Sequence, residues 1–201
     1  KGFYDGLKES GEKEIMSLVR CAWAGSQKYG VLTWSGDIYS SFRAMQEQLQ
    51  AGLNMGMAGI PWGTSDIGGD IKDPAFKELL VRWFAWGAFC PVFRMHGERS
   101  PWYEREQEFI DNVRQLTSGQ DNEVWSFGED NYEILKKYLF VRENMRPYIR
   151  KCMRAASETG APVMRPLFFD FPEDKKCWET EDVYMFVIML NFSCVPAVTS
   201  I

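Results

Sequence analysis

Four polar residues each follow a short apolar run in the first half of the chain. They are Arg20, Asp37, Asp66 and His96, the last of which is the only histidine. Each apolar run is typical of a buried strand. Because a (β/α) barrel builds its active site from polar side chains at the carboxyl ends of successive strands, this order predicts a catalytic or binding edge.

Asp37 is the candidate catalytic residue, because it closes the segment Trp34-Ser35-Gly36-Asp37 in a turn after an apolar run. A glycosidase needs a carboxylic acid that protonates the leaving oxygen, and such an acid holds its proton near neutral pH only in a suitable environment. The adjacent tryptophan could supply an apolar wall for this purpose. The same tetrapeptide also fits an ordinary turn in which an aspartate bonds its own backbone.

Asp66 and Arg20 are candidate sugar-binding residues. Asp66 stands before a glycine pair and could accept hydrogen bonds from vicinal sugar hydroxyls, or it could make an Asx-type turn. Arg20 could bond a hydroxyl and hold a catalytic carboxylate ionised, or it could serve a structural ion pair. Trp34 and Trp62 could stack on sugar rings, although core packing is the default for any tryptophan.

Arg94 and His96 lie two residues apart, so on a strand their side chains face the same side. The bland interpretation of His96 is a buried, hydrogen-bonded core histidine. A lone histidine argues against a multi-histidine metal site, so no metal ligand is predicted.

Hydrophobic periodicity predicts strands that alternate with helices, which implies a parallel sheet. Residues 2–9 fit the end of a helix, and Ser41 and Asp73-Pro74 fit helix starts. Strands are predicted at residues 15–20, 29–34, 55–62 and 89–93, helices at 42–53, from 73 onward and at 131–157 with a break at Pro147, an exposed loop at 98–120, and a strand at 162–170.

Composition narrows the class of protein. The chain has 201 residues, 45% of them hydrophobic and 15% aromatic, which suits a packed globular core. The net charge is −5, so the chain lacks the excess of basic residues that is typical of nucleic-acid-binding proteins. No apolar run reaches the length of a membrane span. Five widely spaced cysteines favour free thiols over a disulfide scaffold. No Gly-rich phosphate loop follows the first strand, which argues against a nicotinamide or nucleotide enzyme.

Taken together, the motifs resemble glycoside hydrolase family 31, whose members include α-glucosidases and α-xylosidases. The resemblance covers roughly residues 1–186. The motifs that carry it are residues 20–30, the segment Trp34-Ser35-Gly36-Asp37, residues 51–56, Gly59-Ile60-Pro61-Trp62, Ser65-Asp66-Ile67-Gly68-Gly69 and Phe93-Arg94-Met95-His96.

The resemblance implies an α/β fold in which residues 1–160 form the C-terminal half of a (β/α)8 TIM barrel, strands 5–8. Residues 161–201 would begin a C-terminal β-sandwich domain. By the same resemblance Asp37 matches the general acid/base of a retaining enzyme. The residues matching the subsite of the cleaved sugar are Arg20, Trp34, Trp62, Asp66, Arg94 and His96.

Three departures from the family pattern stand out. The family's nucleophile is an aspartate on the strand before the first strand of this chain, so these residues do not supply it. Asp70 and Gly63 replace aromatic positions beside the sugar. Residues 187–201 are atypical, because a Gly-Pro-Asp-type turn is expected after Phe186, and a reading-frame change would explain this.

The expected function is hydrolysis of α-linked glycosides such as α-glucosides or α-xylosides, with no cofactor, nucleic acid or membrane partner. The isolated chain is expected to be nearly inactive without its nucleophile. The alternative is a non-catalytic carbohydrate-binding or remnant fragment. Half a barrel also exposes two apolar sheet edges, which would favour a homo-oligomer.

Overall fold

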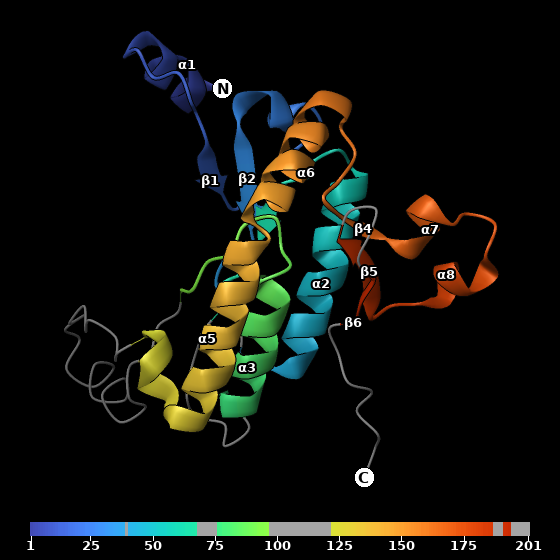
Figure 1. Cartoon of the computed structure of the whole chain (residues 1–201). Helices are drawn as coiled ribbons and strands as arrows, with labels where there is room; N and C mark the ends of the chain where they lie inside the picture. The colour runs from blue at the N-terminus through green and yellow to red at the C-terminus, as the bar shows by residue number, and fades with distance from the viewer. Residues whose placement is uncertain (39, 68–75, 97–121, 187–190, 194–201) are drawn as a thin grey trace, which may run out of the picture.

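The computed structural model describes residues 1–38, 40–67, 76–96, 122–186 and 191–193 (Figure 1). The predicted helix start at Asp73-Pro74 and the predicted loop at 98–120 lie outside the described residues, as does the aromatic-to-acid departure at Asp70. Among the described helices, none is both long and apolar enough to cross a membrane.

A parallel sheet forms the N-terminal part of the fold. Its strands are β1 (Ser17–Val19), β2 (Val31–Trp34) and β3 (Gly63–Thr64), in the order β1-β2-β3. Leu18 lies opposite Leu32, and Thr33 lies opposite Gly63. A further parallel bridge joins Ile67 to Met95, so residues 92–96 continue the sheet beyond β3. The predicted parallel sheet is therefore confirmed, with its first two strands inside the predicted segments 15–20 and 29–34.

Helices connect and cover these strands, as parallel pairing requires. In sequence, α1 (Gly2–Glu9) precedes β1, and the 3₁₀ turn η1 (Ser26–Tyr29) lies between β1 and β2. The helix α2 (Phe42–Met57) connects β2 to β3. Ser41 caps α2 as predicted, because its side chain accepts a hydrogen bond from the Ala44 amide at 3.1 Å. The helix α3 (Phe76–Gly87) precedes the segment that carries Arg94.

The long C-terminal helical region breaks where proline predicts. After η2 (Val124–Phe127), α5 (Glu129–Asn144) ends before Met145 and α6 (Arg146–Thr159) begins with Pro147 in its first turn. Gly160 ends α6 with φ of 77°, a left-handed conformation that glycine adopts without strain. Figure 1 shows α5 lying along α3. The largest fully buried side chains fill the core around them: Trp83, Tyr184, Phe84, Phe186, Met45, Leu49 and Leu135.

The pairing of strands changes after Gly160. β4 (Met164–Pro166), β5 (Val183–Phe186) and β6 (Asn191–Ser193) form an antiparallel sheet in the order β4-β5-β6, with α7 (Leu167–Asp170) and α8 (Lys175–Glu179) between β4 and β5. β6 lies within the segment that the sequence marks as atypical. The proposed division into domains at residue 160 stays a prediction.

Three predicted strands have different bounds in the structure. The sequence predicts a strand at residues 55–62. In the structure α2 continues to Met57 and strand pairing begins at Gly63. Within this stretch, Gly56 belongs to the helix and lies against Pro162 and Met164. Residues 89–92 form a turn and bends after α3, and the parallel bridge lies beyond the predicted bounds, at Met95. The strand expected at 162–170 stops at Pro166, and α7 follows.

An ion pair explains the short β4. The Arg165 guanidinium donates two hydrogen bonds of 2.7 Å to the two carboxylate oxygens of Asp170, five residues later. Such a span requires the chain to turn back on itself, which ends the extended segment. Arg165 is only 5% exposed, so this paired geometry satisfies a charge that would otherwise be buried at high cost.

Two glycines of α2 face β4, and they predict different responses to substitution. A Cβ at Gly56 would lie 2.9 Å from Pro162 Cβ and 3.2 Å from the Met164 carbonyl oxygen, which are rigid neighbours. A Cβ at Gly52 would lie 3.1 Å from Met164 Cε, the free end of a flexible side chain.

We expect Gly56→Ala to lower the free energy of unfolding by about 1–3 kcal/mol through overpacking. The matched control Gly52→Ala should change it by less than about 1 kcal/mol, because better helix propensity offsets a small shift of Met164. Urea denaturation followed by circular dichroism measures both. Equal effects of the two substitutions would contradict this packing of α2 on β4.

Candidate active site

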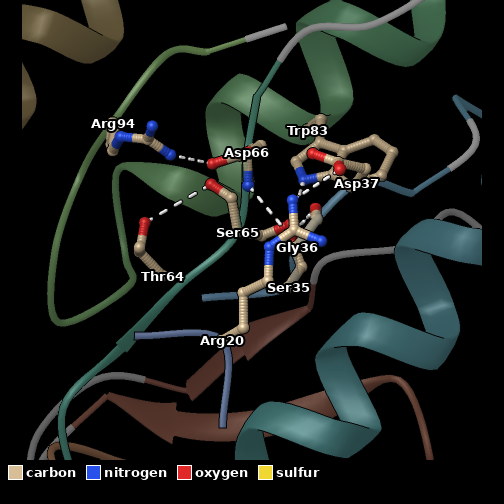
Figure 2. A network of polar contacts seen from close by, with 9 residues as sticks. All are labelled: Arg20, Ser35, Gly36, Asp37, Thr64, Ser65, Asp66, Trp83 and Arg94. Atoms are coloured by element: carbon tan, nitrogen blue, oxygen red, sulfur yellow. Dashed lines mark hydrogen bonds and ion pairs between the residues drawn. The ribbon is translucent and has the colours of Figure 1, made fainter. Parts of the chain in front are cut away.

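The carboxyl ends of the parallel strands bring four charged residues together. Arg20 follows β1, Asp37 follows β2, Asp66 follows β3, and Arg94 precedes the bridge at Met95. Figure 2 shows Arg20 pointing toward Asp37 and Arg94 pointing toward Asp66, within one network of polar contacts. The structure therefore gathers four of the predicted site residues at one edge of the sheet.

Asp37 is the accessible carboxylate of this network. Its Oδ2 accepts a hydrogen bond from Arg20 Nη2 at 2.5 Å, and the two side chains are 79% and 59% exposed, respectively. An ion pair this exposed stabilises a fold by only about 0–1 kcal/mol. Its main consequence is orientation, because the guanidinium holds one carboxylate oxygen and leaves the other open to solvent.

The Trp34 side chain contacts Arg20 and Asp66. The Arg20 guanidinium carbon lies 5.4 Å from the centroid of the indole, a cation–π distance. The apolar wall that the sequence suggested beside Asp37 is not formed, since the Asp37 side chain remains 79% exposed. Trp34 thus supports the guanidinium that orients Asp37.

Asp66 is the buried carboxylate of the network, with 8% of the residue exposed. Its Oδ1 accepts a hydrogen bond from Arg94 Nη1, and its backbone N–H donates to Ser35 Oγ at 3.3 Å. Burial raises the pKa of Asp66, against the lowering effects of the positive charges of Arg94 and His96. The nearby negative charge of Asp37 raises the pKa of Asp66 further, and a hydrogen bond from the Trp34 side chain lowers it.

Two serines that sequence reasoning missed support this edge. Ser35 Oγ accepts the hydrogen bond from the Asp66 amide and so links the ends of β2 and β3. Ser65 Oγ accepts a buried hydrogen bond of 3.1 Å from Trp83 Nε1, which fixes the end of β3 to α3 (Figure 2). Isolated serines carry no signal in a single sequence, so only the fold could reveal them.

The remaining two predicted residues take different positions. His96 is exposed, and its backbone N–H donates to the Ile67 carbonyl oxygen at 3.0 Å, which places it at the same edge. Trp62 is half-buried, and its carbonyl oxygen accepts hydrogen bonds from the Thr33 amide and hydroxyl. Among the contacts of the described residues, none joins the Trp62 indole to the network around Asp37.

A cavity of about 210 Å³ opens next to the network. It is bounded by the ends of β2 and β3, by α2, by the C-terminal end of α3 and by β4. The lining residues that bear on the site are Arg20, Trp34, Ser35, Ser65, Trp86 and Met164. No cluster of three or more metal-ligating side chains occurs within the described ranges.

Comparison with known proteins assigns the class and then the family. Residues 1–151 match the family described as the glycosyl hydrolases family 31 TIM-barrel domain. Residues 160–190 match the glycosyl hydrolase family 31 C-terminal domain. Together with the parallel sheet and its crossover helices, this defines an α/β protein of the TIM-barrel class. The chain belongs to glycosyl hydrolase family 31.

Relatives include α-xylosidases and glucosidases. A crystal structure of an α-xylosidase from a soil metagenome, complexed with xylose, is 57% identical over 92% of this chain and 28% of its own, with a TM-score of 0.81. The α-xylosidase of Saccharolobus solfataricus is 32% identical over 98% of this chain and 25% of its own length. A family 31 glucosidase of Pseudescherichia vulneris is 67% identical over 50% of this chain and 20% of its own length. The chain thus spans about a fifth to just over a quarter of the length of these relatives.

The burial of Asp66 predicts a pH dependence of stability. Because the folded-state pKa of Asp66 is raised above its ordinary value of 3.8, the folded state holds this proton more tightly than the unfolded chain does. The resulting stabilisation is fully present below pH 3.8 and is lost as pH rises through the raised pKa.

We therefore expect Asp66→Asn to show a smaller fall in unfolding free energy than the wild type as pH rises from about 3.8 to 7. Denaturant titrations at several pH values measure this. Asp5→Asn serves as the control, because it removes a half-buried carboxylate of α1 that pairs with Lys1 and does not touch the network. A wild-type stability that rises more steeply than that of Asp66→Asn over this range would contradict a raised pKa of Asp66 in the folded state.

Proposed function

We propose that residues 1–160 are the C-terminal half of the catalytic barrel of a retaining α-glycosidase, strands 5–8, and that Asp37 is its general acid/base. The observation that carries the proposal is the exposed Asp37 carboxylate, held by Arg20 beside the buried pair of Asp66 and Arg94. An accessible carboxylate is needed for proton transfer to a bound glycoside, and a buried one suits fixed hydrogen bonds to hydroxyls.

The reaction would proceed by two displacements. Asp37 protonates the leaving glycosidic oxygen while a second carboxylate attacks the anomeric carbon and forms a glycosyl-enzyme intermediate. Asp37 then removes a proton from water, which hydrolyses the intermediate with overall retention of configuration. The two carboxyl groups must lie roughly 5–5.5 Å apart, and the second is expected on the strand that precedes β1 in the barrel.

The other residues at the edge would bind the sugar that is cleaved. Asp66 would accept hydrogen bonds from vicinal hydroxyls, with Arg94 and His96 donating to the same ring. Trp34 offers a flat aromatic face, and Trp62 is proposed for the same subsite by the family resemblance. In this arrangement Arg20 orients Asp37 between the ring and the leaving group.

The substrate class proposed is α-linked xylosides or glucosides. Support comes from the relatives, which include an α-xylosidase complexed with xylose and an α-glucosidase of Bacillus thermoamyloliquefaciens. Each of these substrates presents vicinal hydroxyls to a carboxylate such as Asp66. Residues 161–201 would begin the β-sandwich domain, in keeping with the antiparallel order of β4, β5 and β6.

A second candidate is a carbohydrate-binding chain without catalysis. The apolar side chains Met16 and Leu18, at or next to β1, are 56% and 40% exposed, as expected for a barrel edge that needs a neighbouring strand. Without that neighbour, Asp37 would have no nucleophile opposite it, and the chain would keep only its sugar contacts. The same exposed edge would favour self-association.

Turnover of aryl α-xylosides and α-glucosides tests the catalytic proposal. We expect no measurable turnover by the 201-residue chain alone, and activity when it is joined to a polypeptide that supplies the preceding barrel strands. In the joined protein, Asp37→Ala should lower kcat by roughly 10²–10⁴-fold. The exposed Asp130→Ala on α5 is the matched control and should leave the rate unchanged.

Two results would overturn the proposal. One is turnover by the 201-residue chain alone that Asp37→Ala abolishes, since this would place both carboxylates within it. The other is an active joined protein whose rate Asp37→Ala leaves unchanged, since the acid/base role would then belong elsewhere.

A further inference from the structure

The turn between α3 and the Arg94 segment is held by a guanidinium from a distant helix. Arg142 of α5 donates from Nη1 to the carbonyl oxygens of Ala88 at 2.9 Å and Cys90 at 2.7 Å. Its Nη2 donates to the Pro91 carbonyl oxygen at 2.9 Å. Three hydrogen bonds from one planar group to one turn fix both the position and the orientation of that turn.

Tyr184 of β5 holds the same turn from another direction. Its hydroxyl donates to the Phe89 carbonyl oxygen at 3.0 Å, and the tyrosine is fully buried. Between them, Arg142 and Tyr184 bind every carbonyl group from residue 88 to residue 91. We call these two side chains the turn clamp.

Burial and charge explain why an arginine stands at this position. Arg142 is half-buried, and this burial lowers the pKa of its guanidinium from the ordinary value. In the part of the chain that the structure describes, no carboxylate pairs with it. The carbonyl groups that follow α3 replace the missing counter-ion, because the negative end of the helix dipole points at this turn.

The clamped turn leads directly into the segment that presents Arg94 and His96. The Val92 amide donates to the Gly63 carbonyl oxygen at 3.4 Å, and the His96 amide donates to the Ile67 carbonyl oxygen at 3.0 Å. This pairing is sparse compared with that of β1 and β2. Because a slip by one residue would turn Arg94 away from Asp66, the register of this segment needs a fixed starting point.

We propose that Arg142 and Tyr184 are positioning residues for the active site: by fixing residues 88–91 they set the register of residues 92–96 and so aim Arg94 at Asp66. Neither clamp residue touches the sugar-binding edge itself. The value of this positioning for substrate binding rests on the proposed function, whereas the register can be measured without any sugar.

Amide hydrogen exchange of the 201-residue chain, resolved by NMR, measures the register directly. The reporter is the His96 amide, which is bonded to Ile67. The reference amides are those of Thr33, bonded to Trp62, and Ile149, bonded to Met145. The imidazole signal of His96 gives a second readout. It is identified without ambiguity, because the chain has a single histidine.

Three variants and one control separate positioning from general destabilisation. Arg142→Met keeps the packing of the stem and removes all donors. Arg142→Lys keeps the charge but offers a point-like ammonium that cannot span the three carbonyls. Tyr184→Phe removes only the hydroxyl and remains informative if the Arg142 variants fail to fold. Arg146→Ala, which breaks an exposed ion pair with Glu143, is the control.

We expect the His96 amide to exchange at least roughly tenfold faster in Arg142→Met, with smaller increases in Arg142→Lys and Tyr184→Phe. The Thr33 and Ile149 amides should keep their rates, and the His96 imidazole signal should shift in the same order of variants. Arg146→Ala should change neither readout.

The inference is overturned if the His96 amide keeps its protection in all three variants. It is also overturned if the His96, Thr33 and Ile149 amides accelerate together, since the clamp would then serve only global stability. Neither readout involves turnover or Asp37, so these results leave the proposed glycosidase activity to its own test.

Discussion

Parallel hydrogen bonding between successive strands is the constraint on which the site depends. β1, β2, β3 and the segment at Met95 all run in the same direction, so their carboxyl ends meet at one edge of the sheet. Residues far apart in sequence, such as Arg20 and Arg94, therefore join one network. The helices matter for function chiefly because parallel strands cannot be joined by short turns.

The two carboxylates at this edge have different surroundings. Asp37 stands in solvent with one arginine, whereas Asp66 is buried between Arg94 and the end of β2. Carboxyl groups whose surroundings differ in this way are suited to different tasks, one to proton transfer and one to fixed recognition. Across the edge the charges run positive, negative, negative, positive, so each carboxylate has its own arginine, and the negative charge of Asp37 raises the pKa of Asp66.

Sequence reasoning identified the charged residues of the edge because each closes an apolar run, and the pattern of runs reflects burial. It misplaced the strands at 55–62 and 89–93 because short apolar, glycine-rich segments fit a helix end or a turn equally well. It missed Ser35, whose hydroxyl reaches the site only through its hydrogen bond from the Asp66 amide. Arg142 escaped it too, since its partner Ala88 lies 54 residues away and only tertiary packing brings the two together.

Binding of a sugar at this edge of the sheet can be tested by NMR of the chain with methyl α-xyloside. We predict saturable shifts of the Trp34 indole N–H and His96 imidazole signals, and their loss in Asp66→Asn, while signals of α7 and α8, which do not line the cavity, stay in place. Shifts confined to α7 and α8, or no shift at saturating glycoside, would contradict binding at this edge.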